Sequence, residues 1–104
     1  MSERLAKLRK FLEDDPTDTF TRYAIALEQS KLGDDAATVQ AFEEVLQHDP
    51  SYAPAYHQLG LFFAARGQAD AARAALERGI AAAKAVSDAH AASEMQETLD
   101  ELTS

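Results

Sequence analysis

The chain has 104 residues, of which 46% are hydrophobic, so it is long enough for one compact domain with a single buried core. Eighteen acidic residues against ten basic ones give a formal net charge of -8, which disfavours nucleic acid and anionic membrane surfaces as partners. The absence of cysteine excludes a disulfide framework, a thiolate zinc site and a cysteine nucleophile.

Apolar residues recur at helical spacing along the chain, and no stretch alternates as a β-strand would. For example, Val39, Phe42, Val45 and Leu46 fall on one face of an amphipathic helix, which has to pack against a neighbour. We expect an all-α fold of about six helices, near residues 2–13, 19–31, 35–48, 53–66, 69–84 and 88–102.

Glycine and aspartate separate several of the expected helices. Gly33 and Gly67 stand where a helix can end in the left-handed conformation, and Asp34 follows where its carboxylate can cap the next helix. Each pair of helices is therefore predicted to be joined by a tight turn.

Two aspartate–proline pairs, Asp15-Pro16 and Asp49-Pro50, are predicted to end other helices. The residue before a proline is kept out of the helical region, and the proline has no N–H group to donate. The next helix can take its cap from the residues that follow, namely Thr17, Asp18 or Ser51.

Many of these residues repeat with a spacing of 34. The spacing separates the two prolines and the two turn glycines just described, and it links the apolar series Leu8, Phe42, Leu76 and Leu12, Leu46, Ile80. Together with the motif of the second unit, this period resembles the tetratricopeptide repeat. The motif residues are Tyr56, Leu59, Gly60, Phe63, Gly67, Ala72, Leu76 and Ile80.

The other units match this pattern less closely. In residues 19–52, Arg22 and Gln29 occupy the two aromatic positions, and in the last helix His90, Ser93 and Glu94 stand where an aromatic residue, leucine and glycine are expected. The resemblance implies a short right-handed α-solenoid of antiparallel helix pairs within one domain, 1–104. Its parts would be a capping half-repeat (2–15), two repeats (19–52 and 53–86) and a C-terminal capping helix (87–104).

The alanine-rich stretch 64–92 could instead form one long helix or a coiled coil. We expect Gly67 and Gly79 to interrupt it, and no leucine heptad persists over several turns.

In tetratricopeptide proteins the first helix of each pair usually lines a concave surface. The resemblance therefore implies a partner-binding face on two helices, and we assign the contacts to Phe20, Tyr23, Leu27, Lys31, His57 and Leu61. Ser30, Pro54 and Ala64 would share this face. The partner would be a peptide or a helix of another protein. Alternatively, several of these side chains pack against neighbouring helices, and an exposed Leu27–Leu61 pair would favour binding.

Some relatives hold a carboxylate-ended peptide with lysine, arginine and asparagine at set inner positions. Here those positions hold Tyr23, Leu27, His57, Gln58 and Leu61, so we do not expect a receptor of that type.

No motif for catalysis, a cofactor or a metal is present. Glu44 and His48 share one helical face, but two ligands do not make a metal site, and His48 fits a helix C-terminus, where a cation is favoured. Gly-rich phosphate loops, nucleophile elbows and calcium loops are missing. We predict no enzyme, no cofactor and no metal, with a small metal-dependent enzyme as the remote alternative.

Charge is distributed unevenly along the chain. Residues 1–10 carry a net charge of +3, from four bases and one acid, whereas residues 85–104 carry five acids and no lysine or arginine. The end helices could therefore meet across molecules in a homodimer or larger assembly. Two solvated helix faces are the alternative. No apolar run approaches the roughly 20 residues that span a bilayer, so we expect a cytoplasmic protein.

Overall fold

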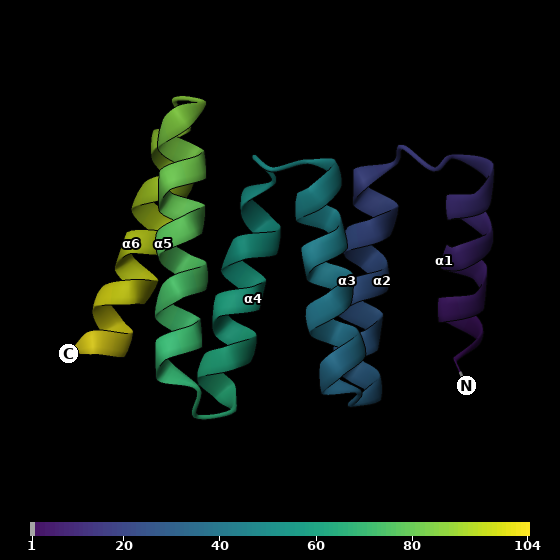
Figure 1. Ribbon diagram of the computed structural model, residues 1–104, viewed down its shortest axis with the longest axis horizontal. Coiled ribbons are helices and arrows are strands. Elements are labelled where there is room, and N and C mark those ends of the chain that lie inside the picture. The colour runs from purple at the N-terminus through teal and green to yellow at the C-terminus, as the bar shows by residue number, and fades with distance from the viewer. Residues whose placement is uncertain (1) are drawn as a thin grey trace. The chain divides into compact units, whose positions relative to one another are not determined.

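The computed structural model describes residues 2–104 and contains all six expected helices (Figure 1). They are α1 (Glu3–Asp14), α2 (Thr19–Leu32), α3 (Asp35–His48), α4 (Ala53–Ala65), α5 (Ala69–Ala85) and α6 (Ala89–Thr103). Every helix end lies within one residue of its predicted position, and there is no strand in the described part of the chain. The all-α class is confirmed.

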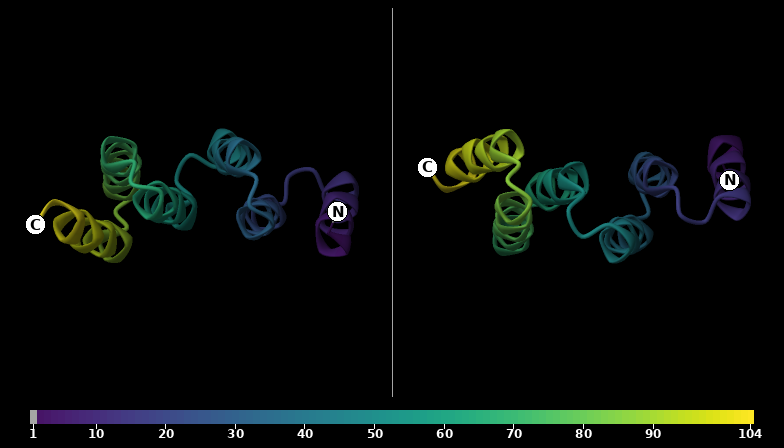
Figure 2. Two further views of the ribbon diagram at one scale, coloured as in Figure 1. Left: turned by 90° about the horizontal axis from the view of Figure 1, so that it is seen from below. Right: turned by 90° about the horizontal axis from the view of Figure 1, so that it is seen from above.

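The helices form two compact units, one ending at Pro50 and one comprising Ser51–Ser104. In the first unit α2 packs against both α1 and α3, and in the second unit α5 packs against both α4 and α6. Figure 2 looks nearly along the helices and shows α4, α5 and α6 at the corners of a triangle. The grouping of both units into one domain, 1–104, stays a prediction.

The core of the first unit is centred on Phe42 of α3, which is fully buried together with Ala26 and Val45. The ring of Tyr23 in α2 lies against this phenylalanine, with 6.3 Å between the ring centroids. Thr38 is also fully buried, and its hydroxyl donates a hydrogen bond of 2.7 Å to the Asp34 carbonyl. The polar side chain is buried at low cost because its hydrogen bond is made.

A buried carboxylate connects the start of α1 to α2. The Ser2 hydroxyl accepts a hydrogen bond from the Leu5 N–H and donates one of 2.6 Å to Glu28 Oε2. The other carboxylate oxygen lies 3.6 Å from Arg4 Nε. An unpartnered carboxylate would be costly to bury, so these contacts stabilise the packing of α1 on α2.

The predicted turn residues act as expected at most helix ends. Asp18 and Asp34 cap α2 and α3 by accepting backbone N–H bonds, and Gly33 and Gly67 adopt left-handed φ angles of +83° and +73°. At α4, Tyr52 rather than the expected Ser51 is the N-cap residue, and neither α4 nor α5 is capped by a side chain.

Close helix approach in the second unit depends on two glycines. A Cβ atom added at Gly60 would lie 2.7 Å from Leu76 Cγ, and one added at Gly79 would lie 2.6 Å from Tyr56 Cβ and 2.5 Å from Met95 Sδ. The expectation that Gly79 interrupts the helix is wrong, because α5 runs through it without a break. Its lack of a side chain instead lets α4 and α6 pack closely against α5.

The last helix departs from the 34-residue period. Helix α4 begins 34 residues after α2 (Thr19 to Ala53), whereas α6 begins 36 residues after α4 (Ala53 to Ala89). The cause is α5, which has 17 residues against 14 in α3. The buried positions of α6 are consequently Ala92 and Met95, which explains the poor match of His90, Ser93 and Glu94 to the repeat pattern.

Candidate protein-interaction site

Four of the predicted partner-binding residues lie on one face of α2, because they are three or four residues apart. Phe20 is 66% exposed and Lys31 is exposed, whereas Tyr23 and Leu27 between them are partly buried. Ser30 is also partly buried. The face therefore offers one exposed ring and the edges of two further apolar side chains.

Lys31, the one charged residue among these four, lies beside an acidic residue of the same helix. The ammonium group of Lys31 lies 3.9 Å from Glu28 Oε1, at a distance typical of a weak, solvent-screened ion pair. Because the lysine side chain is largely exposed, it can turn toward a partner at little cost.

In the second unit, His57 of α4 contacts α6. Its Nε2 atom lies 2.7 Å from the hydroxyl oxygen of Thr98. This hydroxyl donates to the Glu94 carbonyl at 3.2 Å, so the Nε2–H group of His57 is the donor to Thr98. The histidine that we expected to orient a partner's polar groups thus has a partner within its own unit.

One helical turn beyond this hydrogen bond, α4 and α6 each present an exposed leucine. Leu61 is four residues after His57 and 40% exposed, and Leu102 is four residues after Thr98 and 43% exposed. Leu27, the residue of α2 that is equivalent to Leu61, is partly buried. The exposed apolar pair of the second unit is therefore Leu61 with Leu102, not Leu61 with Leu27.

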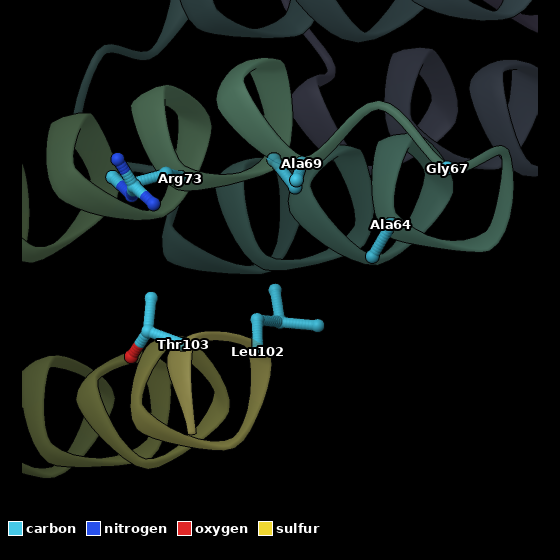
Figure 3. A pocket seen from close by; sticks show the side chains of 7 residues that line it. Ala64, Gly67, Ala69, Arg73, Leu102 and Thr103 are labelled. Atoms are coloured by element: carbon cyan, nitrogen blue, oxygen red, sulfur yellow. The ribbon is translucent and has the colours of Figure 1, made fainter.

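A cavity of about 220 Å³ lies beside Leu102, where the ends of α4 and α6 meet the start of α5 (Figure 3). We call it the α4–α6 pocket. It is lined by Ala64, Gly67, Ala69, Ala72, Arg73, Leu102 and Thr103. In Figure 3 the Leu102 side chain extends from α6 toward the segment that carries Ala64 and Gly67. An apolar cavity of about 150 Å³ holds a benzene molecule, so this pocket can admit one apolar side chain of a partner.

Arg73 supplies the only charge in the pocket lining, which otherwise consists mainly of small apolar side chains. Its guanidinium group forms no ion pair within residues 2–104 and is exposed. Arginine donates several hydrogen bonds from a planar group, so it can bind a carbonyl or carboxylate oxygen of whatever enters the pocket.

Sequence reasoning placed Ala64 and Leu61 on the binding face but missed Leu102 and Arg73. Leu102 was missed because α6 is displaced from the 34-residue period. Arg73 was missed because it lies on the second helix of its pair, which the family resemblance places away from the concave surface. Only the packing of three helices brings these residues together.

No group of three or more histidine, aspartate or glutamate side chains within residues 2–104 could hold a metal ion. Glu44 and His48 are both exposed, and His90 Nε2 lies 3.3 Å from Glu94 Oε1 within α6. Within the same residues, none of the six helices combines the length and the apolar character that crossing a membrane requires.

Solved structures similar to this chain contain the same helical repeat fold. A protein of Bordetella parapertussis is 25% identical and superposes with a TM-score of 0.80, over 99% of this chain and 90% of that one. A tetratricopeptide repeat domain protein of Salinibacter ruber is 32% identical, with a TM-score of 0.76 over 85% of this chain and 89% of that one. The MamA protein is 25% identical, with a TM-score of 0.66 over 95% of this chain and 56% of that one.

Comparison with curated proteins gives no match. The family model of the tetratricopeptide repeat matches residues 31–95, which is more than half of the chain. This range includes α3, α4 and α5, whose turns and close helix contacts are described above. The chain belongs to the tetratricopeptide repeat family.

Proposed function

We propose that this chain binds a segment of another protein and that the first helices of the two repeats, with α6, supply the contacts. Tetratricopeptide repeat domains are generally protein–protein interaction modules, and the proposed role requires no catalytic step. The observation that carries the proposal is the α4–α6 pocket with the exposed Leu102 in its lining, while the exposed Leu61 lies one helical turn before Ala64 of the same lining. Exposed apolar side chains around a cavity are typical of interaction sites.

In the second unit an apolar side chain of the partner would enter the α4–α6 pocket between Ala64 and Leu102. Burying it removes apolar surface of both molecules from water, which is the main favourable contribution to binding. Arg73 would donate hydrogen bonds to an oxygen of the partner backbone or of an acidic side chain. These hydrogen bonds would set the position of the partner backbone and therefore determine which of its side chains enters the pocket.

In the first unit the partner would contact Phe20, Tyr23 and Leu27, with Lys31 at the end of the face. The Phe20 ring is the main apolar surface available, and large exposed aromatic rings often contribute strongly to binding. We also propose that this interaction takes place in the cytoplasm.

The test is a selection of peptides from a random display library against the full chain, followed by NMR titration of the selected synthetic peptide. We expect chemical-shift changes at the backbone amides of Ala64, Gly67, Arg73 and Leu102. The proposal is contradicted if no peptide is enriched, or if the shifts fall neither on these residues nor on Phe20, Tyr23 and Leu27 of the first unit.

A matched pair of variants isolates the pocket. Ala64 lines the pocket, whereas its neighbour Ala65 is exposed and does not. Ala64→Glu should weaken peptide binding at least about tenfold, and Ala65→Glu should leave it unchanged. Thermal melts of both variants show whether each still folds. Equal binding by the two folded variants would exclude the pocket as the site.

A further inference from the structure

One face of α1 is uncovered at positions that are buried in the two repeats. The 34-residue period aligns Leu8 with Phe42 and Leu76, which are both fully buried, yet Leu8 itself is only partly buried. The difference indicates that, within residues 2–104, α1 has no first helix beside it of the kind that packs against α3 and α5.

The adjacent position shows the same difference more strongly. Phe11 aligns with Val45 and Gly79, which are both buried, but 64% of Phe11 is exposed. Gly79 packs against Tyr56, which belongs to the first helix of the same pair. The exposed side of α1 is therefore the side that a first helix would cover, and no helix within the described residues covers it.

The uncovered face of α1 is bordered by positive charge. Lys7 lies four residues before Phe11 and thus on the same side of the helix, and Lys10 follows in the next turn. Neither lysine forms an ion pair in the described part of the chain, whereas Arg4 is already paired with Glu28. We call Lys7, Leu8, Lys10 and Phe11 the α1 face.

The second unit has an open groove between α5 and α6. It has a volume of about 490 Å³ and is lined by Ile80, Lys84, Ala89, Ala92, Ser93, Gln96, Glu97 and Asp100. A hollow of about 430 Å³ shares Ile80, Lys84 and Gln96 with it and adds Glu77, Ala81 and Leu99. We call these two hollows the α5–α6 groove. Its floor is apolar, and its lining contains three acidic residues and one lysine, so the groove is acidic.

The position of this groove is that of a missing second helix. Helix α6 follows α4 with an offset of 36 residues, so Gln96 takes the place of Gly60. Gly60 contacts Leu76, which lies on the second helix of its pair. The side of α6 that carries Gln96 is thus the side on which a paired second helix would lie, and the described residues contain none.

We propose that α1 of a second copy of this chain occupies the α5–α6 groove and acts as that second helix. Leu8 and Phe11 would lie over Ile80, Ala92 and Leu99. Lys7 would lie near Glu97 at the rim, and Lys10 adds to the positive charge that faces the acidic groove. The two surfaces complete each other, because among residues 2–104 no first helix pairs with α1 and no second helix pairs with α6. Their opposite charges select this pairing over the pairing of two α1 helices.

The side chain at position 96 sets the strength of this contact. Gln96 is larger than the glycine that it replaces, so the docked helix stays farther from α6 than α5 does from α4. We therefore expect association that depends on protein concentration. Because the two surfaces differ, a pair of bound copies still has one free α1 face and one free α5–α6 groove. Further copies can add at both, so the copies form chains or rings rather than a closed two-fold dimer.

Sedimentation velocity of the full chain over a range of concentrations tests the proposal. A salt concentration of about 0.1 M limits the Debye length to roughly 10 Å and so screens the repulsion between two acidic molecules. The wild type should increase in mass with concentration. A wild type that stays monomeric up to the highest soluble concentration overturns the proposal.

Two exposed phenylalanines provide a matched pair of variants. Phe11 is 64% exposed on the α1 face, and Phe20 is 66% exposed on α2 outside it. Phe11→Asp should raise the dissociation constant for self-association at least about tenfold, and Phe20→Asp should leave it unchanged. Equal effects of the two substitutions would contradict the proposed surface.

Mixing two charge-reversed variants tests which surfaces meet. Lys7→Glu with Lys10→Glu reverses only the α1 face, and Glu97→Lys with Asp100→Lys reverses only the α5–α6 groove. Each folded double variant should be monomeric alone, because its two surfaces then carry like charge. A one-to-one mixture should assemble with concentration as the wild type does, since the unchanged α1 face meets the unchanged groove and the reversed α1 face meets the reversed groove. A mixture that stays monomeric, or a double variant that assembles alone like the wild type, would overturn the proposal.

Discussion

Gly60 of α4 lies so close to Leu76 of α5 that a Cβ atom on the glycine would come within 2.7 Å of the leucine Cγ. This contact sets the distance between the two helices of the second repeat, whose remaining core consists mainly of alanines and a few large side chains. A larger residue at position 60 has to push the helices apart or displace Leu76.

We predict that Gly60→Leu lowers the free energy of unfolding by about 3 kcal/mol, because overpacking a tight core costs about this much. For a domain of this size, the melting temperature should fall by roughly 12 °C or more. Ala65→Leu, on the exposed side of the same helix, is the control and should change stability by no more than about 0.5 kcal/mol. Equal melting temperatures of the two variants would contradict the packing of α4 on α5.

The two buried glycines should respond differently to alanine. At Gly60 the added methyl group lies 2.7 Å from Cγ of the fully buried Leu76, so this side chain has to shift within a packed core, while alanine improves helix propensity by about 1 kcal/mol. At Gly79 it meets Tyr56 Cβ, which can move only with its backbone. Gly60→Ala should therefore lose less than about 1 kcal/mol, whereas Gly79→Ala should lose about 1 to 2 kcal/mol in chemical denaturation. A larger loss of stability in Gly60→Ala than in Gly79→Ala would show that Leu76 is the more rigid neighbour.

The helices and the turns were predictable from the sequence, whereas the pocket was not. Helical spacing and turn residues such as Gly33 and Gly67 act over a few neighbouring positions, so they can be read directly from the order of residues. Gly79 was misinterpreted because a glycine that interrupts a helix and one that allows close packing look the same in the sequence. Leu102 and Arg73 come together only through the length of α5, which was not evident from a 34-residue period.

Glu28 should contribute more to stability than either base beside it. Its carboxylate is buried and accepts the Ser2 hydroxyl, whereas Arg4 and Lys31 are largely exposed. We expect Glu28→Ala to cost about 2 kcal/mol, and Arg4→Ala or Lys31→Ala less than about 1 kcal/mol each. Hydrogen exchange should show the loss of protection mainly in α1. If Glu28→Ala costs no more stability than Lys31→Ala, α1 is held on α2 by apolar packing alone.

The hydrogen bond between His57 and Thr98 should couple α4 to α6 directly. Thr98→Val keeps the shape of the side chain but removes the oxygen that accepts the His57 Nε2–H group, and His57→Ala removes the donor. In a double-mutant cycle we expect a coupling energy of about 1 kcal/mol from urea unfolding, since the bond is partly buried. Thr103→Val is the matched control, because the Thr103 hydroxyl donates only to carbonyl groups of its own helix. Its coupling to His57→Ala should be close to zero. If both cycles give the same value, the contact between α4 and α6 does not depend on this hydrogen bond, and His57 becomes available to a partner as the sequence first indicated.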